Sequence, residues 1–312
     1  MKELFSILIF PGFLFLCLLS FMAEFLDRKL HARMQNRIGP PWFQPFADFI
    51  KLVSKEEIIP REANTAMFLA TPVFALAATV TAFLYVPLWN AGGLSSFDGD
   101  VIVVLYLLTI PTMAIFLGGW YSTSLFSRLG AVRAITQLFA YEVPLFIGIL
   151  SAALLAGTWS LSGIRAFFNS HPALWLVNIA GFCVSLIALM GKLERVPFDI
   201  PEAETEIVAG SFTEYSGRSL ALFRLTLGVE MVVGASLLAA VFFPMASGIA
   251  PAARFALYLA EVAVIVGLIA LLRTLFARLR LDQMVAFCWR YVAPLGIFQL
   301  LVNLFLKGFV VK

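Results

Sequence analysis

Long apolar runs alternate with short polar connections along the whole chain. A helix needs about 20 predominantly apolar residues to cross a bilayer. Eight runs reach that length, so the pattern predicts eight spanning helices at roughly 4–26, 66–88, 101–121, 134–156, 173–193, 219–243, 253–276 and 286–306. No repeat, low-complexity tract or linker separates these runs, and we expect residues 1–312 to form a single polytopic membrane domain.

A second pattern occurs in the polar connection after the first run. From Trp42 to Val53, apolar residues recur every three or four positions, while Asp48, Lys51 and Lys55 occupy other faces. This spacing is typical of an amphipathic helix that lies flat in the membrane interface. The expected fold is therefore an all-α integral membrane protein with eight transmembrane helices and a short amphipathic interfacial helix in the first loop.

The composition supports a lipid environment. Hydrophobic residues make up 61% of the chain and charged residues only 13%, whereas soluble domains carry about 25% charged residues. The net charge of +3 indicates no nucleic-acid surface, because such surfaces need clustered Lys and Arg. The three cysteines are far apart and the two histidines stand alone. This spacing indicates no metal site, iron–sulfur cluster or haem, and we expect no cofactor in this chain.

The basic residues predict the orientation in the membrane. Most of the 22 Lys and Arg residues lie in the first, third, fifth and seventh connections. The positive-inside rule places these connections in the cytoplasm. We therefore expect a multi-pass protein of the cell membrane with both termini outside the cytoplasm. The first apolar run lacks a small-residue cleavage site, so it is interpreted as a retained helix.

The connection after the fifth apolar run is rich in carboxylates: Asp199, Glu202, Glu204, Glu206 and Glu214. Glu202 and Glu206 are four residues apart, so on a helix they share a face where like charges repel. Repulsion in a desolvated site raises the proton affinity of such groups. One interpretation is that this loop binds and releases protons. The alternative is a solvated acidic loop with ordinary helix caps.

Three glutamates, Glu142, Glu230 and Glu261, lie inside apolar runs. A charge near the bilayer centre costs at least about 2.5 kcal/mol on insertion scales, so these side chains should face the bundle interior. We interpret them as proton-accepting sites that lead inward from the acidic loop. Arg224 lies too far along the chain from Glu230 to share its helix face at the usual spacing. The alternative is that the glutamates are polar contacts between helices.

Basic residues cluster just after the first run: Arg28, Lys29, Arg33 and Arg37. The cluster is interpreted either as an anchor to lipid headgroups or as a docking surface for a soluble partner. Three further basic residues lie beside the carboxylates and complete the candidate coupling set: Lys192, Arg195 and Arg224.

Three motifs together resemble a known family. They are DRKLHARMQNRIGP, QPFADFIKL with the following KEEIIP, and RVPFDIPEAETEIVAG with TEYSG. They look like the membrane subunit of respiratory complex I that joins the redox arm to the membrane arm. The same subunit occurs in membrane-bound, energy-converting nickel–iron hydrogenases and related ferredoxin-linked complexes. The resemblance covers essentially the whole chain.

The resemblance implies roles for residues and partners. Glu142, in its YEVP context, matches a membrane glutamate of the family's proton route. The acidic loop matches the one beside the quinone cavity of complex I. It would face a catalytic large subunit and a small iron–sulfur subunit in the cytoplasm, with antiporter-like membrane subunits as further partners. Iron–sulfur clusters, and in a hydrogenase a nickel–iron centre, would lie in those partners.

Departures from complex I favour one branch of the family. The stretch MQNRIGPPWFQP is one residue shorter than its complex I counterpart and lacks the first Gly-Pro. Lys192 stands where complex I has a glutamate. A second complex I glutamate aligns with Leu227, and Glu230 lies three residues further on nearly the same helix face. At these positions the chain is more similar to the hydrogenase and sulfane-reductase branch, which needs no quinone.

The leading hypothesis is a membrane-anchor and coupling subunit of a multisubunit redox-driven ion pump, of the ferredoxin-linked hydrogenase type. It would contribute no complete active site to the oxidoreductase and would couple electron transfer to proton or sodium movement. Three alternatives stay open at this point. They are the quinone-site subunit of a complex I-like enzyme, an independent transporter, and a structural anchor for a soluble enzyme.

Overall fold

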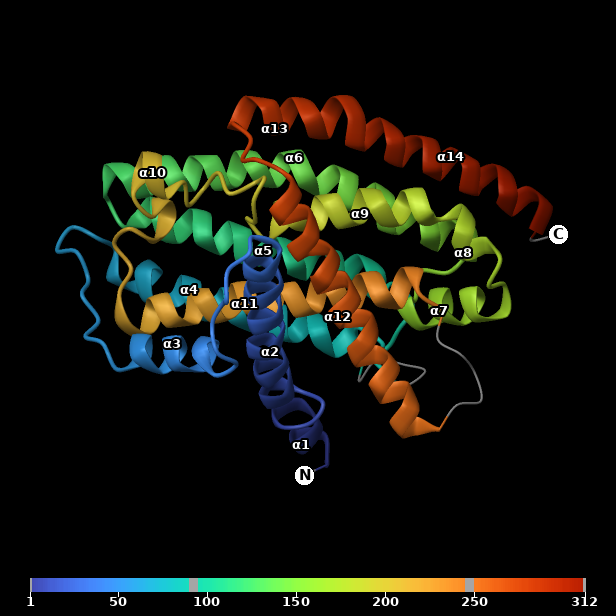
Figure 1. Ribbon diagram of the computed structural model, residues 1–312, viewed down its shortest axis with the longest axis horizontal. Coiled ribbons are helices and arrows are strands. Elements are labelled where there is room, and N and C mark those ends of the chain that lie inside the picture. The colour runs from blue at the N-terminus through green and yellow to red at the C-terminus, as the bar shows by residue number, and fades with distance from the viewer. Residues whose placement is uncertain (1, 90–94, 245–249, 311–312) are drawn as a thin grey trace.

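The computed structural model describes residues 2–89, 95–244 and 250–310, and every element within these ranges is helical (Figure 1). The elements are α1 (Lys2–Leu8), α2 (Phe13–Met34), α3 (Gln44–Val53), α4 (Thr65–Tyr85), α5 (Asp100–Tyr121), α6 (Leu125–Ala156), α7 (Leu161–Ser170), α8 (Leu174–Val177), α9 (Ile179–Lys192), α10 (Glu204–Ile207), η1 (Gly210–Phe212), α11 (Gly217–Phe242), α12 (Pro251–Leu275), α13 (Leu281–Phe287), η2 (Cys288–Val292) and α14 (Ala293–Val310). The short element η1 is a 3-10 turn, and η2 is a π-helical turn between α13 and α14.

Seven helices in the described ranges are long and apolar enough to cross a membrane: Phe5–Met34, Thr65–Tyr85, Asp100–Tyr121, Leu125–Ala156, Gly217–Phe242, Pro251–Leu275 and Leu281–Gly308. The fifth predicted span, 173–193, is not among them. Asn178 divides it into α8 and α9, and α9 has 14 residues. The Asn178 side chain donates to the carbonyl of Leu174 at 3.1 Å, and such local bonds compete with a continuous helix.

The predicted amphipathic segment is a helix, Gln44–Val53. Phe49 packs against Phe21 of α2, with ring centroids 5.7 Å apart. Phe46 and Ile50 stay half exposed. The helix therefore presents an apolar surface beyond its contact with α2, and its position in the membrane interface stays a prediction.

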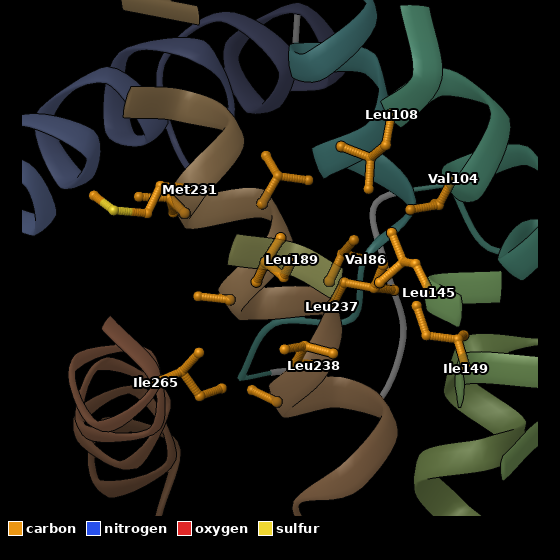
Figure 2. Close-up of a cluster of buried hydrophobic side chains, with 14 of the residues drawn as sticks. Val86, Val104, Leu108, Leu145, Ile149, Leu189, Met231, Leu237, Leu238 and Ile265 are labelled. Atoms are coloured by element: carbon orange, nitrogen blue, oxygen red, sulfur yellow. The ribbon is translucent and has the colours of Figure 1, made fainter. Parts of the chain in front are cut away.

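Helix α11 lies at the centre of the bundle, and α2 and α12 cross in front of it in Figure 1. Every residue of α11 from 228 to 242 is buried. Figure 2 shows its side chains packed among those of α5, α6, α9 and α12. The contact with α9 is close, because a Cβ atom on Gly234 would lie 2.4 Å from Leu189. Small residues commonly permit such close approach of membrane helices.

A network of amide side chains holds α14 against the bundle. Asn303 donates to the side chain of Asn178 at 2.8 Å and to the carbonyl of Ser151 at 2.9 Å. Gln299 donates to Asn303 at 2.9 Å. Three elements, α14, α6 and the α8–α9 break, are thereby joined, and buried polar groups obtain the partners that lipid cannot supply.

The acidic segment, defined here as residues 193–216 between α9 and α11, lies along α6. Gln137 of α6 donates to the carbonyls of Gly191 at 2.7 Å and Phe198 at 2.9 Å. Nearer the start of α6, Gly130 lies against the backbone of η1, where a Cβ atom would be 2.4 Å from the nitrogen of Ser211. The segment is therefore held to a spanning helix at two points.

The end of the acidic segment is held by an aromatic contact. The ring of Tyr215 stacks on Phe68 of α4, with centroids 4.0 Å apart and planes 7° from parallel. Its hydroxyl lies 3.2 Å from that of Thr71. The segment is thus anchored to both α4 and α6.

We expect Gly130→Ala to lower stability by about 1–3 kcal/mol, because the added methyl would collide with the backbone of η1. Gly308→Ala on α14 is a matched control, since no atom lies within 4 Å of its added Cβ. The control should be neutral or stabilising by up to about 1 kcal/mol. Thermal unfolding in detergent measures both variants, and equal midpoints would contradict the close contact.

Candidate functional site

A charged pair is buried at the centre of the bundle. The ammonium of Lys192, at the end of α9, lies 2.7 Å from a carboxylate oxygen of Glu230 in α11. The two side chains are 2% and 1% exposed. Removing charges from water is costly, and a close partner offsets part of that cost. The pair joins α9 and α11, and a sequence comparison alone cannot show that these two helices meet.

Further groups surround Lys192. Its ammonium donates to the carbonyl of Leu108 in α5 and lies 5.8 Å from the ring centroid of Tyr141 in α6. It also attracts the partly buried carboxyl of Glu142, the residue after Tyr141. One lysine on α9 therefore interacts with groups from three other spanning helices, and it can respond to the charge of two glutamates.

A polar cavity of about 130 Å³ lies beside this pair. Its lining is mostly charged: Glu24, Arg28, Leu193, Glu194, Arg195, Glu202, Arg224, Leu227 and Gly228. Within it, Arg224 of α11 lies 2.5 Å from Glu202 of the acidic segment. A cavity with several polar walls can hold ordered water. It connects the acidic segment with the helix that carries Glu230.

Glu194 is the buried acid of this cavity, with only 7% of its surface exposed. Burial raises the pKa of Glu194 to about 8, and repulsion from Glu202, Glu230 and Asp199 adds to the effect, whereas Arg224 opposes it. One of its oxygens, Oε2, is buried without a hydrogen-bond partner among the described groups. A carboxyl in this state can exchange a proton near neutral pH.

A second buried carboxylate, Asp27 of α2, organises the edge of the site. It is fully buried and lies 2.9 Å from Arg273 of α12 and 3.5 Å from Arg195 of the acidic segment. One carboxylate therefore joins the ends of two spanning helices to the start of the acidic segment.

The other residues of the predicted acidic loop lie further out. Glu206 is exposed and binds Arg133 at 2.6 Å and Arg278 at 3.3 Å. The hydrogen bond from Arg133 is the main cause that lowers the pKa of Glu206. Asp199 and Glu214 are partly buried, and the side chain of Glu204 lies outside the described part of the structure.

Glu261 does not join this group. It lies 3.4 Å from Arg165 of α7, which also donates to the carbonyls of Pro87 and Leu88 beyond the end of α4. The acidic segment contacts the opposite end of α4, through Tyr215. The predicted line of three glutamates is therefore divided: Glu230 binds Lys192, Glu142 follows Tyr141, whose ring Lys192 faces, and Glu261 lies near the other end of the bundle.

The basic cluster after the first run is also divided. Arg28 binds Glu24 and Asp48, the latter at 2.9 Å, and so links α2 to α3. Lys29 donates to the carbonyl of Pro40 at 3.4 Å. Arg33 and Arg37 are exposed. Of these four residues, only Arg33 and Arg37 can contact a partner without first breaking a contact within the described ranges.

Sequence reasoning does not identify Glu24, Asp27 or Glu194 as site residues. Glu24 and Asp27 are three apart at the end of the first apolar run, and this spacing on one helix face is a detectable signal. Glu194 has no such signal, because its burial depends on packing between distant segments. Within the described ranges, no group of three His, Cys, Asp or Glu residues is placed to hold a metal ion.

Known proteins resemble this chain along most of its length. A sequence model described as NADH dehydrogenase matches residues 5–304. The H subunit of the NADH-quinone oxidoreductase of Dehalococcoides mccartyi is 34% identical over 302 residues, which cover 94% of this chain and 84% of that protein. The corresponding protein of Bacillus cereus is 34% identical over 299 residues, which cover 91% and 87%.

The fold resembles a chain in the structure of the membrane-bound sulfane sulfur reductase, an archaeal respiratory membrane complex. The TM-score is 0.87 at 22% identity, and the match covers 97% of this chain and 100% of that one. The family match and the relatives agree with the resemblance found in the sequence motifs. The chain therefore belongs to the NADH dehydrogenase subunit 1 family of multi-pass, all-helical membrane proteins.

Proposed function

We propose that this chain is the membrane-anchor and coupling subunit of a multisubunit redox-driven ion pump. It would contribute no complete active site of its own to the oxidoreductase. The observation that carries the proposal is the polar cavity between the acidic segment and the Lys192–Glu230 pair. Relatives at 34% identity are subunits of NADH-quinone oxidoreductase, which supports a role in an oxidoreductase complex.

The route begins at the acidic segment and leads inward. Glu202, paired with Arg224, lines the cavity together with Glu194. Beyond the cavity, Glu230 binds Lys192, and Lys192 attracts Glu142 on α6. Each step is a short change of partner between groups of opposite charge, so a proton or cation can advance without leaving an unpaired charge in lipid. Asp199, Glu204, Glu206 and Glu214 belong to the entrance in this proposal.

Reduction and re-oxidation of a partner beside the acidic segment drive the first step. Added negative charge raises the proton affinity of nearby carboxyls, and Glu194 already holds its proton up to a pH of about 8. Moving one charge against 100 mV costs roughly 2.3 kcal/mol. A shift of about 1.7 pKa units, at about 1.36 kcal/mol each, supplies the same free energy. Because Glu194 is already protonated below a pH of about 8, reduction of the partner makes it hold that proton more tightly, and re-oxidation lets the proton pass on toward Glu230.

The proposed partners follow from the exposed charges and from the family. The acidic segment and the exposed Arg33 and Arg37 would contact a large subunit and a small iron–sulfur subunit in the cytoplasm. Antiporter-like membrane subunits would complete the pump. In this arrangement α3 lies in the membrane interface, α8 and α9 together act as an eighth span, and both termini face away from the cytoplasm.

We propose that the complex is of the ferredoxin-linked hydrogenase type. Lys192 supports this branch, because it replaces a complex I glutamate and is neutralised by Glu230. The alternative, a quinone-site subunit, is favoured by the names of the sequence relatives. Metal and lipid-extract analysis of the intact complex tests the choice. Nickel supports the hydrogenase type, and bound quinone without nickel would overturn it.

We expect Glu142→Gln to lower ion pumping by about tenfold or more, because an amide cannot accept a proton. Electron transfer in the partner subunits should persist. Ion uptake into vesicles and the reduction of the iron–sulfur centres measure the two processes separately. Glu62→Gln, at an exposed position, is the matched control, and Glu261→Gln tests the remaining membrane glutamate. Normal pumping by Glu142→Gln would remove this residue from the route.

We expect Lys192→Met and Glu230→Leu each to lower stability by about 3–5 kcal/mol, since each leaves a buried charge without its partner. The double variant should recover most of the loss, because both charges are then absent. The control is Glu206→Gln at the exposed pair with Arg133, which should cost about 0–1 kcal/mol. Thermal unfolding in detergent gives the comparison, and additive losses in the double variant would show that the two charges do not interact.

We expect an infrared band of a protonated carboxyl that is present in the native chain near pH 6 and absent in Glu194→Gln. The band should disappear as pH rises through about 8, the pKa of Glu194. Because this pKa exceeds the ordinary value of 4.5, the group's contribution to stability is complete below pH 4.5 and is lost as pH rises to about 8. Loss of the band near pH 4.5 would contradict the buried state.

A further inference from the structure

Two pockets adjoin between the start of α5 and the end of α6, at the opposite ends of these helices from the acidic segment. The first has a volume of about 400 Å³ and is lined by Asp98, Gly99, Ile102, Gly157, Thr158 and Trp159. The second has a volume of about 220 Å³ and is lined by Ile102, Leu105, Tyr106, Phe146, Leu150 and Trp159. Two residues line both pockets, which therefore form one surface groove, called here the α5–α6 groove. The proposed ion route does not use it.

The α5–α6 groove is polar at one end and apolar at the other. Asp98 and Gly99 precede α5, and residues 157–159 follow α6, so the polar part lies where two spanning helices end. Tyr106 is in the second turn of α5, and Phe146 is ten residues before the end of α6, which is about 15 Å along the helix. The apolar part therefore lies beside the membrane-embedded length of both helices. This order matches a polar headgroup followed by an acyl chain.

The groove is preformed and open to lipid. The backbone of Val101 donates to the carbonyl of Trp159 at 3.3 Å, which fixes the two walls to each other at the polar end. The rings of Tyr106 and Phe146 join the walls in the apolar part, with centroids 6.0 Å apart. Trp159 and Tyr106 are both exposed, and exposed Trp side chains are enriched at the headgroup level of a bilayer. A membrane lipid can therefore enter the groove from the side.

Charges of both signs border the polar part. Asp98 lines it and is exposed. The ammonium of Lys307, near the end of α14, lies 3.6 Å from the position that a Cβ atom on Gly157 would occupy. Within the described ranges, neither charge lies within ion-pair distance of a group of opposite sign. A carboxylate and an ammonium at one pocket are complementary to a ligand that carries both charges.

We infer that the α5–α6 groove binds one phospholipid whose headgroup carries an ammonium as well as a phosphate. The ammonium pairs with Asp98, the phosphate pairs with Lys307, and one acyl chain lies along the apolar part. The apolar walls accept any hydrocarbon chain, so they do not select the lipid. Asp98 selects it, because a headgroup with a phosphate and no ammonium would meet this carboxylate with a like charge. The inference does not depend on the proposed ion route.

Photo-crosslinking tests the inference. The full chain is reconstituted in vesicles of equal parts phosphatidylethanolamine and phosphatidylglycerol, with a trace of either lipid that carries a diazirine on its acyl chain. The label on peptides with Tyr106 or Phe146 is divided by the label on α12, whose exposed residues face lipid elsewhere. We expect this ratio to be about threefold higher for phosphatidylethanolamine. Equal ratios, or a higher ratio for phosphatidylglycerol, would overturn the inference.

Variants of Asp98 test the selection of the headgroup. Asp98→Asn should remove the preference for phosphatidylethanolamine, because the amide carries no charge, and Asp98→Glu should retain it. Asp282→Asn is the matched control, at an exposed aspartate of α13, and it should also retain the preference. A preference that survives Asp98→Asn would overturn the role of this carboxylate. If Asp98→Asn does not reach the membrane, high salt should remove the preference of the unaltered chain, because salt screens exposed charges.

Two further variants test the phosphate contact and the acyl chain. Lys307→Gln should lower labelling of the groove by both lipids, since both carry a phosphate. Ile102→Trp, at an exposed position that lines both pockets, should fill the groove and also lower labelling by both lipids. Lys51→Gln, at an exposed lysine of α3, is the control and should leave labelling unchanged. Undiminished labelling in Ile102→Trp would show that the acyl chain does not lie in this groove.

Discussion

The contact between Lys192 and Glu230 sets the conditions for the rest of the structure. A full charge buried in a membrane protein is costly unless a partner lies close by. The pair therefore requires the end of α9 and the middle of α11 to meet, and α11 is accordingly the most enclosed spanning helix. Gly234 of α11 also lies close to Leu189 of α9, so the same two helices approach each other at a second point. Charge pairing and packing thus specify one arrangement.

The same constraint explains how the acidic segment can carry so many carboxylates beside a bilayer. Glu202 pairs with Arg224 in the polar cavity, and Glu206 pairs further out with Arg133 and Arg278. Glu194 is the exception, because burial and neighbouring acids keep its proton in place up to a pH of about 8. A neutral acid beside paired ones holds its proton more tightly when negative charge arrives nearby and less tightly when that charge leaves.

The acidic segment lies between two cavities of opposite character. One is polar, and Glu194 and Glu202 line it; the other is apolar, and Pro197 and Phe198 line it. The backbone between them is held by Gln137 and by Leu279, which lies just before α13. A change of protonation on one side of so short a segment can therefore affect the packing on the other.

The sequence by itself determined the all-helical membrane class, the family and the approximate limits of most spans, because these depend on local runs of apolar residues and on contiguous motifs. It did not determine the break at Asn178 or the burial of Glu194, and it did not show that Lys192 meets Glu230 while Glu261 meets Arg165. Those features depend on which helix faces meet. Helix contacts between residues far apart in the chain leave no local periodic signal, so only the tertiary structure decided which charges became partners.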